Sequence, residues 1–216
     1  MTWRQAAYEQ VCRHMLPGDV IAFAGRGPVS AVIQSATRSE VSHVGVILPA
    51  PSGRPEGGPG MLQLCESASL EGFAGVTIHG LEQRIGSYDG EVWWLPLHDQ
   101  VRARMDFDAF RAFLVRQEGR PYDLEQAVKS GLDQWDHLDL LSRATYARED
   151  HEQFFCSELV AAAFEASGAV SHLNASEVTP IDLCTFSLYK PDYYQLKGEP
   201  TLIAGYNTRS PEGWGE

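Results

Sequence analysis

The segment that most constrains the fold is FFCSELVAAAFEASG, residues 154–168, which has the strongest helical pattern in the chain. Apolar or small residues recur along one side of it, from Cys156 through Val160 and Phe164, at the spacing of a helix that buries one face. Gly168 directly follows and is well placed to end the helix with a left-handed residue. A helix with so apolar a face requires another layer of structure to cover it.

Short β-rich segments separated by turn residues provide that layer. We expect strands at 19–24, 42–48, 61–67, 74–81 and 91–97, with one more near 201–204, and a turn-rich loop at 49–60. Further helices are expected at 2–15, 28–37 and 106–117, with a helical turn beginning at 179–182. This pattern predicts an α+β domain in which a mostly antiparallel sheet packs against helices.

The length of the chain limits the number of domains, and its charge limits the kinds of partner that it can bind. With 216 residues, we expect residues 1–216 to form a single domain. The formal net charge of −12 disfavours binding to nucleic acid or to an anionic bilayer. The sequence has no apolar run near the roughly 20 residues that span a bilayer, and no signal-type N-terminus. We therefore expect no stable membrane insertion and a cytoplasmic location; the sequence does not indicate the oligomeric state.

The four cysteines, Cys12, Cys65, Cys156 and Cys184, are widely spaced and include no CxxC pair. In a reducing compartment such cysteines are free thiols, and zinc binding would require ligands that cluster more closely. We therefore expect neither disulfides nor a zinc site.

Cys156 is the strongest candidate for a reactive thiol because it falls in the first turn of the predicted helix. Unpaired N–H groups and the helix dipole stabilise a negative charge there, and the thiolate is the nucleophilic form of cysteine. The alternative is a buried structural cysteine, which is a common role.

A thiol nucleophile requires a base, and His43 is notable among seven histidines because it begins an apolar strand. Strands 42–48 and 61–67 are expected to form a hairpin. If Leu48 lies opposite Met61, His43 lies opposite Glu66, where a carboxylate can orient the imidazole. A slip of one residue would instead place Cys65 or Ser67 opposite His43. A solvated carboxylate at the strand end is the alternative role for Glu66.

Several motifs together resemble a known family. PGDVIAF, TRSEVSHVGVIL, a Glu near the end of the next strand, GRPYDL and FFCSELV follow one another between about Pro17 and Leu183. This order resembles the YiiX/YaeF-like proteins, circularly permuted relatives of the NlpC-type papain-fold amidases. The lecithin retinol acyltransferase family is more distantly similar and shares the order of His before Cys.

The resemblance implies a circularly permuted papain-like fold and assigns roles to four residues. It implies that Cys156 is the nucleophile, His43 the base, Glu66 the residue that orients His43, and Tyr122 a tyrosine beside the cysteine that helps to bind the oxyanion. It implies no metal or organic cofactor. The charged stretch after Tyr122 departs from the family pattern, so residues 123–153 are a candidate lid insertion.

The resulting hypothesis is a cysteine hydrolase that cleaves a peptide, isopeptide or N-acyl amide bond in a peptide-like or acyl-amide substrate. The alternatives are transfer of a lipid or thioester acyl group, and a binding module without catalysis on the same fold. His151 is a rival base because it lies five residues before Cys156. Glu158 is interpreted as a helix-start residue, and the GRG at 25–27 is too short for a phosphate loop.

Overall fold

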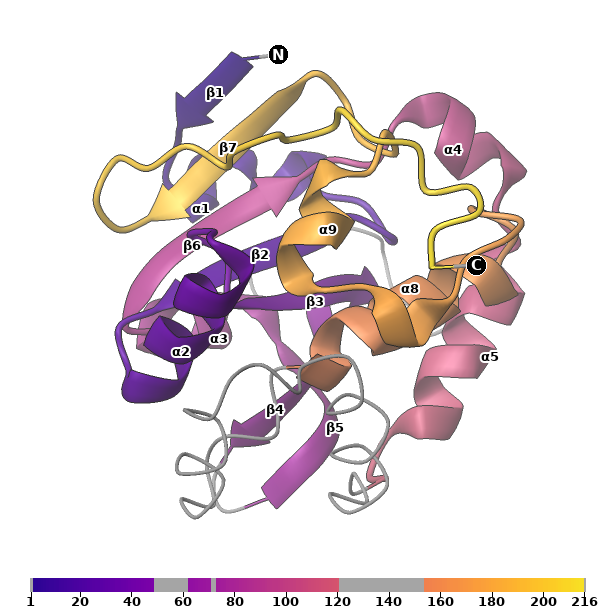
Figure 1. The fold of residues 1–216 in the computed structure, drawn as a ribbon, viewed down its shortest axis with the longest axis horizontal. Coiled ribbons are helices and arrows are strands. Elements are labelled where there is room, and N and C mark those ends of the chain that lie inside the picture. Colours follow the sequence, from indigo (N-terminus) through magenta and orange to yellow (C-terminus); the bar gives the residue numbers. More distant parts are fainter. Residues whose placement is uncertain (1, 49–61, 71–72, 121–153, 216) are drawn as a thin grey trace.

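A computed structural model describes residues 2–48, 62–70, 73–120 and 154–215, and within them the chain forms an α+β structure around one mixed sheet (Figure 1). The sheet has seven strands in the order β1-β7-β6-β2-β3-β4-β5, and all pairs are antiparallel except β1 with β7. The strands are β1 (Thr2–Gln5), β2 (Val20–Gly25), β3 (His43–Leu48), β4 (Gln63–Leu70), β5 (Phe73–Gly80), β6 (Gly90–Leu95) and β7 (Asp192–Lys197).

The helices lie on both faces of this sheet. They are α1 (Tyr8–Val11), α2 (Pro28–Thr37), α3 (Leu81–Ser87), α4 (Asp99–Arg104), α5 (Phe107–Gln117), α8 (Phe154–Ala166) and α9 (Pro180–Thr185), with 3-10 turns η1 (Cys12–His14) and η2 (Ala175–Glu177). Figure 1 shows α8 in front of the central strands, with α5 and α9 beside it.

Side chains alternate between two apolar cores along each central strand. In β3, Val44 and Val46 pack with α8, whereas Ile47 packs on the other side with residues of α1 and α3. β6 divides in the same way, because Trp93 belongs to the α8 core and Trp94 to the core on the α3 side. A sheet that is buried on both faces explains why the central strands read as nearly continuous apolar runs.

Three expected helices are confirmed close to their predicted bounds: 28–37, 106–117 and 154–168. Residues that favour a helix start are present in two of them. Pro28 lies in the first turn of α2, and the Asp106 side chain accepts a hydrogen bond from Ala109 N–H at the start of α5. Gly168 follows α8 with φ 75°, a left-handed conformation that glycine adopts without strain. The predicted turn at 179–182 is the start of α9, capped by Thr179.

The predicted helix over residues 2–15 is wrong. Residues 2–5 instead form β1 in parallel register with β7, where Thr2 pairs with Asp192 and Gln5 with Gln195. Only α1 and η1, residues 8–14, are helical. The partner strand lies nearly at the other end of the chain, so tertiary pairing overrode a local helical pattern that the sequence does present.

The C-terminal strand and two short helices also differ from expectation. Residues 201–204 are not a strand, and the last strand is β7, whose polar DYYQLK sequence has a weak apolar alternation. The short helices α3 and α4, which follow β5 and β6, were not predicted. With seven and six residues, they are too short to show an amphipathic period.

Asp19, in the PGD turn before β2, has a structural role. Its carboxylate is 1% exposed and accepts from the backbone N–H groups of Leu16 and Leu97 and from Trp94 Nε1, each at 2.9 Å. Arg102 forms an ion pair with it. These hydrogen bonds connect the start of β2 to the end of β6.

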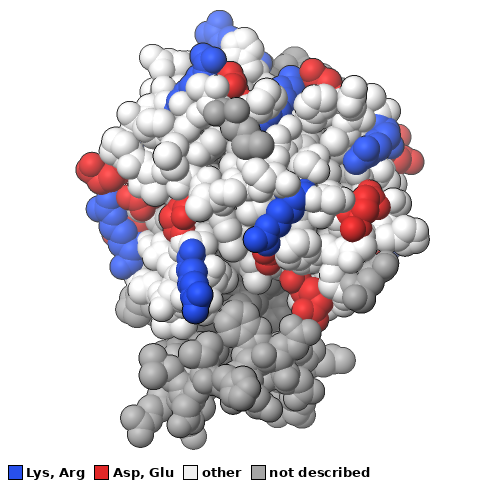
Figure 2. Space-filling model, turned by 45° about the horizontal axis from the view of Figure 1, so that its top comes forward, with Lys and Arg blue, Asp and Glu red and all other residues white. Residues whose placement is uncertain are grey.

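The described surface is mixed in charge. Figure 2 shows one face on which acidic and basic side chains are interspersed among a majority of uncharged residues. Within the part of the chain that the structure describes, no helix has the length and apolar character needed to cross a membrane.

Candidate active site

Cys156 lies in the first turn of α8, as its position in the sequence predicted. The residue is fully buried, and the next turns of the helix place Leu159, Val160 and Ala163 in the core that includes Val44 and Val46. N–H groups in a first turn have no partner within their own helix, so this end of α8 favours a negative charge. The first turn of α8 thus presents unpaired N–H groups next to Cys156.

The imidazole of His43 lies between Cys156 and Glu66. His43 is the first residue of β3 and is 4% exposed. Its Nε2 lies 2.5 Å from Glu66 Oε2, and the Cys156 thiol is hydrogen-bonded to the ring. Thiol, imidazole and carboxylate thus follow one another in one buried chain of polar contacts.

The predicted register of the hairpin is wrong by two residues, yet the predicted contact forms. Leu48 pairs with Gln63 and Gly45 pairs with Glu66, so His43 and Glu66 are diagonal rather than directly opposite. Because side chains alternate with a period of two, this shift leaves both on the same face. That face is the α3 side of the sheet. The body of α8 covers the other face, and its first turn lies next to His43 at the start of β3.

Gly45 makes room for the diagonal contact. A Cβ atom on Gly45 would lie 3.1 Å from Glu66 Cβ, 3.1 Å from Cys65 O and 3.0 Å from Leu64 Cδ1. Those separations are tighter than ordinary van der Waals contact, so a side chain here would displace Glu66. The glycine of SHVG is therefore explained by the approach of β4.

Glu66 is fully buried and surrounded by cationic or basic groups. Arg84 donates Nε–H to Oε1 at 2.7 Å and Nη2–H to Oε2 at 3.3 Å. His79 Nε2 lies 2.7 Å from Oε1, without the alignment of a hydrogen bond. Burial raises the pKa of the Glu66 carboxyl, but the contacts with His43 and His79 and the charge of Arg84 outweigh it and hold that pKa well below its usual range.

The same contacts favour the protonated form of His43. Burial lowers the pKa of the imidazole, but the interactions with Cys156 and Glu66 are stronger together and raise it to about 9. At neutral pH the site therefore favours an imidazolium beside Cys156, which is the partner that a thiolate requires.

Sequence reasoning missed His79, Arg84 and Tyr88. His79 follows two residues after Thr77, the β5 partner of Glu66, and therefore faces the same side of the sheet. A register for β4 and β5 would have found it. Arg84 and Tyr88 come from the unpredicted helix α3 and the turn after it, and nothing in the local sequence marks them.

Several predicted residues cannot be compared with the structure. Tyr122, His151 and the candidate lid 123–153 lie outside the described residues, so their roles stay predictions. Glu158 is partly exposed, and burial raises the pKa of its carboxyl. The GRG segment ends β2 and leads into α2.

Cys12, Cys65 and Cys184 are buried and, like Cys156, form no disulfide. Among the described residues, no three or more His, Cys, Asp or Glu side chains are arranged to hold a metal ion.

Comparison with known proteins yields a structural similarity. No protein-family model matches the chain, and no curated protein matches it. Its structure is similar to the crystal structure of metalloprotein YiiX from Escherichia coli O157:H7, with 20% sequence identity and a TM-score of 0.41. The match covers 70% of this chain and 65% of that one, just under two thirds of its length.

Proposed function

We propose that this protein is a cysteine hydrolase that cleaves an amide bond with Cys156 as nucleophile, His43 as base and Glu66 as the residue that orients His43. The observation that carries the proposal is the buried sequence of contacts from the Cys156 thiol through the His43 ring to Glu66, 2.5 Å from Nε2. The start of a helix, where Cys156 lies, adds a field that favours the thiolate.

The proposal includes a circularly permuted papain-like fold. A cysteine at the start of a helix and a histidine on an antiparallel strand are the arrangement of papain-type enzymes. In those enzymes the cysteine precedes the histidine in the chain. Here the order is His43, Glu66 and then Cys156, with α8 packed on β3 and β4. The similar spatial arrangement and the reversed order are what support the permutation.

The proposed reaction has two halves. In the first, His43 accepts the Cys156 proton, and the thiolate attacks the carbonyl carbon of the substrate. When the C–N bond breaks, His43 returns the proton to the leaving amine and an acyl-thioester remains on Cys156. In the second, His43 takes a proton from water and the hydroxide attacks the thioester; the C–S bond breaks, the carboxylic acid leaves, and His43 returns the proton to the Cys156 thiolate. In this proposal the backbone N–H of Cys156 binds the oxyanion, with Tyr122 as the predicted second donor.

The substrate class stays that of peptide, isopeptide or N-acyl amide, with lipid or thioester acyl transfer and non-catalytic binding as the alternatives. The test is turnover of a mixed amide and ester panel, with thermal melting, for the wild type, C156A, H43A and E66Q. C12A is the matched control because Cys12 is a buried thiol in the other core.

We expect C156A and H43A to fall to background, since residues that act as a unit lose activity together when either is removed. E66Q should retain part of the activity, because the amide keeps the shape of the carboxylate but not its charge. C12A should retain full turnover. A C156A variant as active as the wild type would exclude the thiol mechanism. A wild type that is inert while binding panel members would favour the binding module.

A further inference from the structure

The guanidinium of Arg84 spans both oxygens of Glu66. Its Nε lies 2.7 Å from Oε1 and its Nη2 3.3 Å from Oε2, so the carboxylate is gripped at two points. The Arg84 side chain is 13% exposed and Glu66 is fully buried. This pair therefore differs from a surface ion pair, whose charges water would screen. A planar fork with two contacts fixes the orientation of a carboxylate as well as its charge.

Two aromatic rings hold Arg84 in place. The guanidinium carbon lies 5.5 Å from the centre of the Phe23 ring and 5.0 Å from that of Tyr88, within cation–π range of both. The Phe23 ring is also 5.3 Å from the imidazole of His43. Arg84 thus sits among the side chains that flank His43, and its rotamer is set by packing as well as by Glu66.

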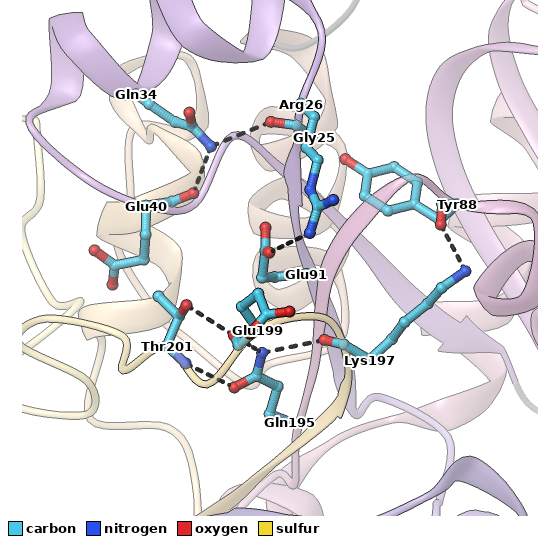
Figure 3. A network of polar contacts seen from close by, with 10 residues as sticks. All are labelled: Gly25, Arg26, Gln34, Glu40, Tyr88, Glu91, Gln195, Lys197, Glu199 and Thr201. Carbon is cyan, nitrogen blue, oxygen red and sulfur yellow. Dashed lines mark hydrogen bonds and ion pairs between the residues drawn. The ribbon is translucent and has the colours of Figure 1, made fainter.

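The helix that carries Arg84 is fastened at both ends. At its start, Leu81 N–H donates to Leu62 O at 3.0 Å, directly before the strand that carries Glu66. At its end, Lys197 Nζ donates to Ile85 O and Gly86 O at 2.9 Å each and to Tyr88 O at 2.6 Å. Figure 3 shows Lys197 reaching from β7 to Tyr88. A seven-residue helix has little stability of its own, so these bonds give Arg84 a fixed base.

The charge of Arg84 compensates the buried carboxylate of Glu66. Glu66 is buried whether His43 carries a proton or not, and a buried carboxylate without a cation is strongly unfavourable. Arginine stays charged at all relevant pH values, unlike the other groups around Glu66. The described titratable or charged groups that face Glu66 and His43 are His79 of β5, Arg84 of α3, Tyr88 after α3 and Cys156 of α8.

We propose that Arg84 is a positioning residue of this site, which holds the Glu66 carboxylate in line with His43 and keeps it ionised in both protonation states of the imidazole. Its catalytic consequence rests on the proposed function, whereas its effect on the titration of His43 does not. With Arg84 present, His43 can release its proton without leaving Glu66 as a buried uncompensated charge.

Removal of the Arg84 charge should therefore make the Glu66–His43 pair retain its proton to higher pH. The measurement is a pH titration of the His43 ring signal by NMR, with the signal assigned by its absence in H43Q. The variants are R84M and R84Q, which remove the charge, and R84K, which keeps it but offers no planar fork. R26M is the control, since Arg26 pairs with Glu91 at the surface, with a side chain that is 54% exposed.

We expect R84M and R84Q to raise the midpoint of the His43 titration by about 1 unit or more, with R84K closer to the wild type and R26M unchanged. The shift should persist in a C156A background, where no thiol contributes. If R84M is too unstable to titrate, R84Q tests the same charge. Variants that melt earlier but titrate like the wild type would show a structural role alone and overturn the inference.

Failure of this inference is distinct from failure of the proposed function. A protein that turns over no substrate yet shows the shift retains the positioning role and loses the hydrolase. A protein that turns over amides through Cys156 while its R84M and R84Q variants titrate like the wild type loses the positioning role only.

Discussion

His43 and Glu66 meet at 2.5 Å although the backbone partner of Glu66 is Gly45. The contact therefore runs diagonally across the hairpin, over a position where no side chain stands. This arrangement brings the carboxylate to Nε2 of the His43 ring. The spacing of the SHVG segment and the position of Glu66 on β4 are thus parts of one geometric requirement.

Substitution of Gly45 by alanine should test that requirement. The new Cβ would approach Glu66 Cβ and Cys65 O to 3.1 Å, so β4 must shift or the contact with His43 must lengthen. We expect G45A to lower the free energy of unfolding by about 1–3 kcal/mol and to reduce turnover. G86A is the control, because nothing lies within 4 Å of a Cβ there. It should be neutral or slightly stabilising in urea unfolding, since alanine favours the helix.

Loss of the Glu66 charge should destabilise the fold. In E66Q, the cationic side chains of Arg84 and His43 would stay buried without their carboxylate. Urea unfolding should show that the free energy of unfolding falls by about 3 kcal/mol relative to the wild type. The pKa of His43 should fall as well. The comparison is E91Q, which removes the partner of Arg26 at the surface and should change stability by less than about 1 kcal/mol. Equal effects of the two substitutions would contradict the buried charge cluster.

The stability of the protein should depend on the protonation of His43. The pKa of this residue rises from 6.5 to about 9 on folding, so the folded state binds the proton more tightly. The stabilisation is fully present below pH 6.5 and is lost as the pH rises through about 9. It is on the order of 3 kcal/mol. Urea unfolding between pH 6 and pH 10 should show this decline in the wild type, and a flatter profile in H43Q.

Cys156 should be the most reactive of the four thiols. Burial raises the pKa of Cys65 to about 12 and that of Cys184 well above its usual value. Cys156 instead has an imidazolium partner and the start of α8 beside it. Limiting iodoacetamide at pH 6, followed by peptide mass mapping, should modify Cys156 before Cys12, Cys65 and Cys184. Uniform labelling of the thiols would contradict an activated Cys156, and H43Q should abolish the preference.

The sequence was most informative where structure is local. Residues 154–168, 106–117 and 28–37 form helices as predicted, because apolar period, capping residue and terminating glycine all act within a few residues. The central strands were likewise marked by β-branched apolar runs. The N-terminal helix was wrong because β1 pairs with β7, and a pairing across nearly the whole chain has no local signature.

The residues of the candidate site divide along the same line. The sequence by itself determined that Cys156 starts a helix and that His43 starts a strand, but it left open whether the register puts Glu66 on the face of His43. Only the tertiary structure decided that Gly45, and not His43, pairs with Glu66, and that Arg84, His79 and Tyr88 complete its surroundings. Side-chain period is fixed by the backbone of one strand, whereas register and charge neighbours depend on how separate elements pack.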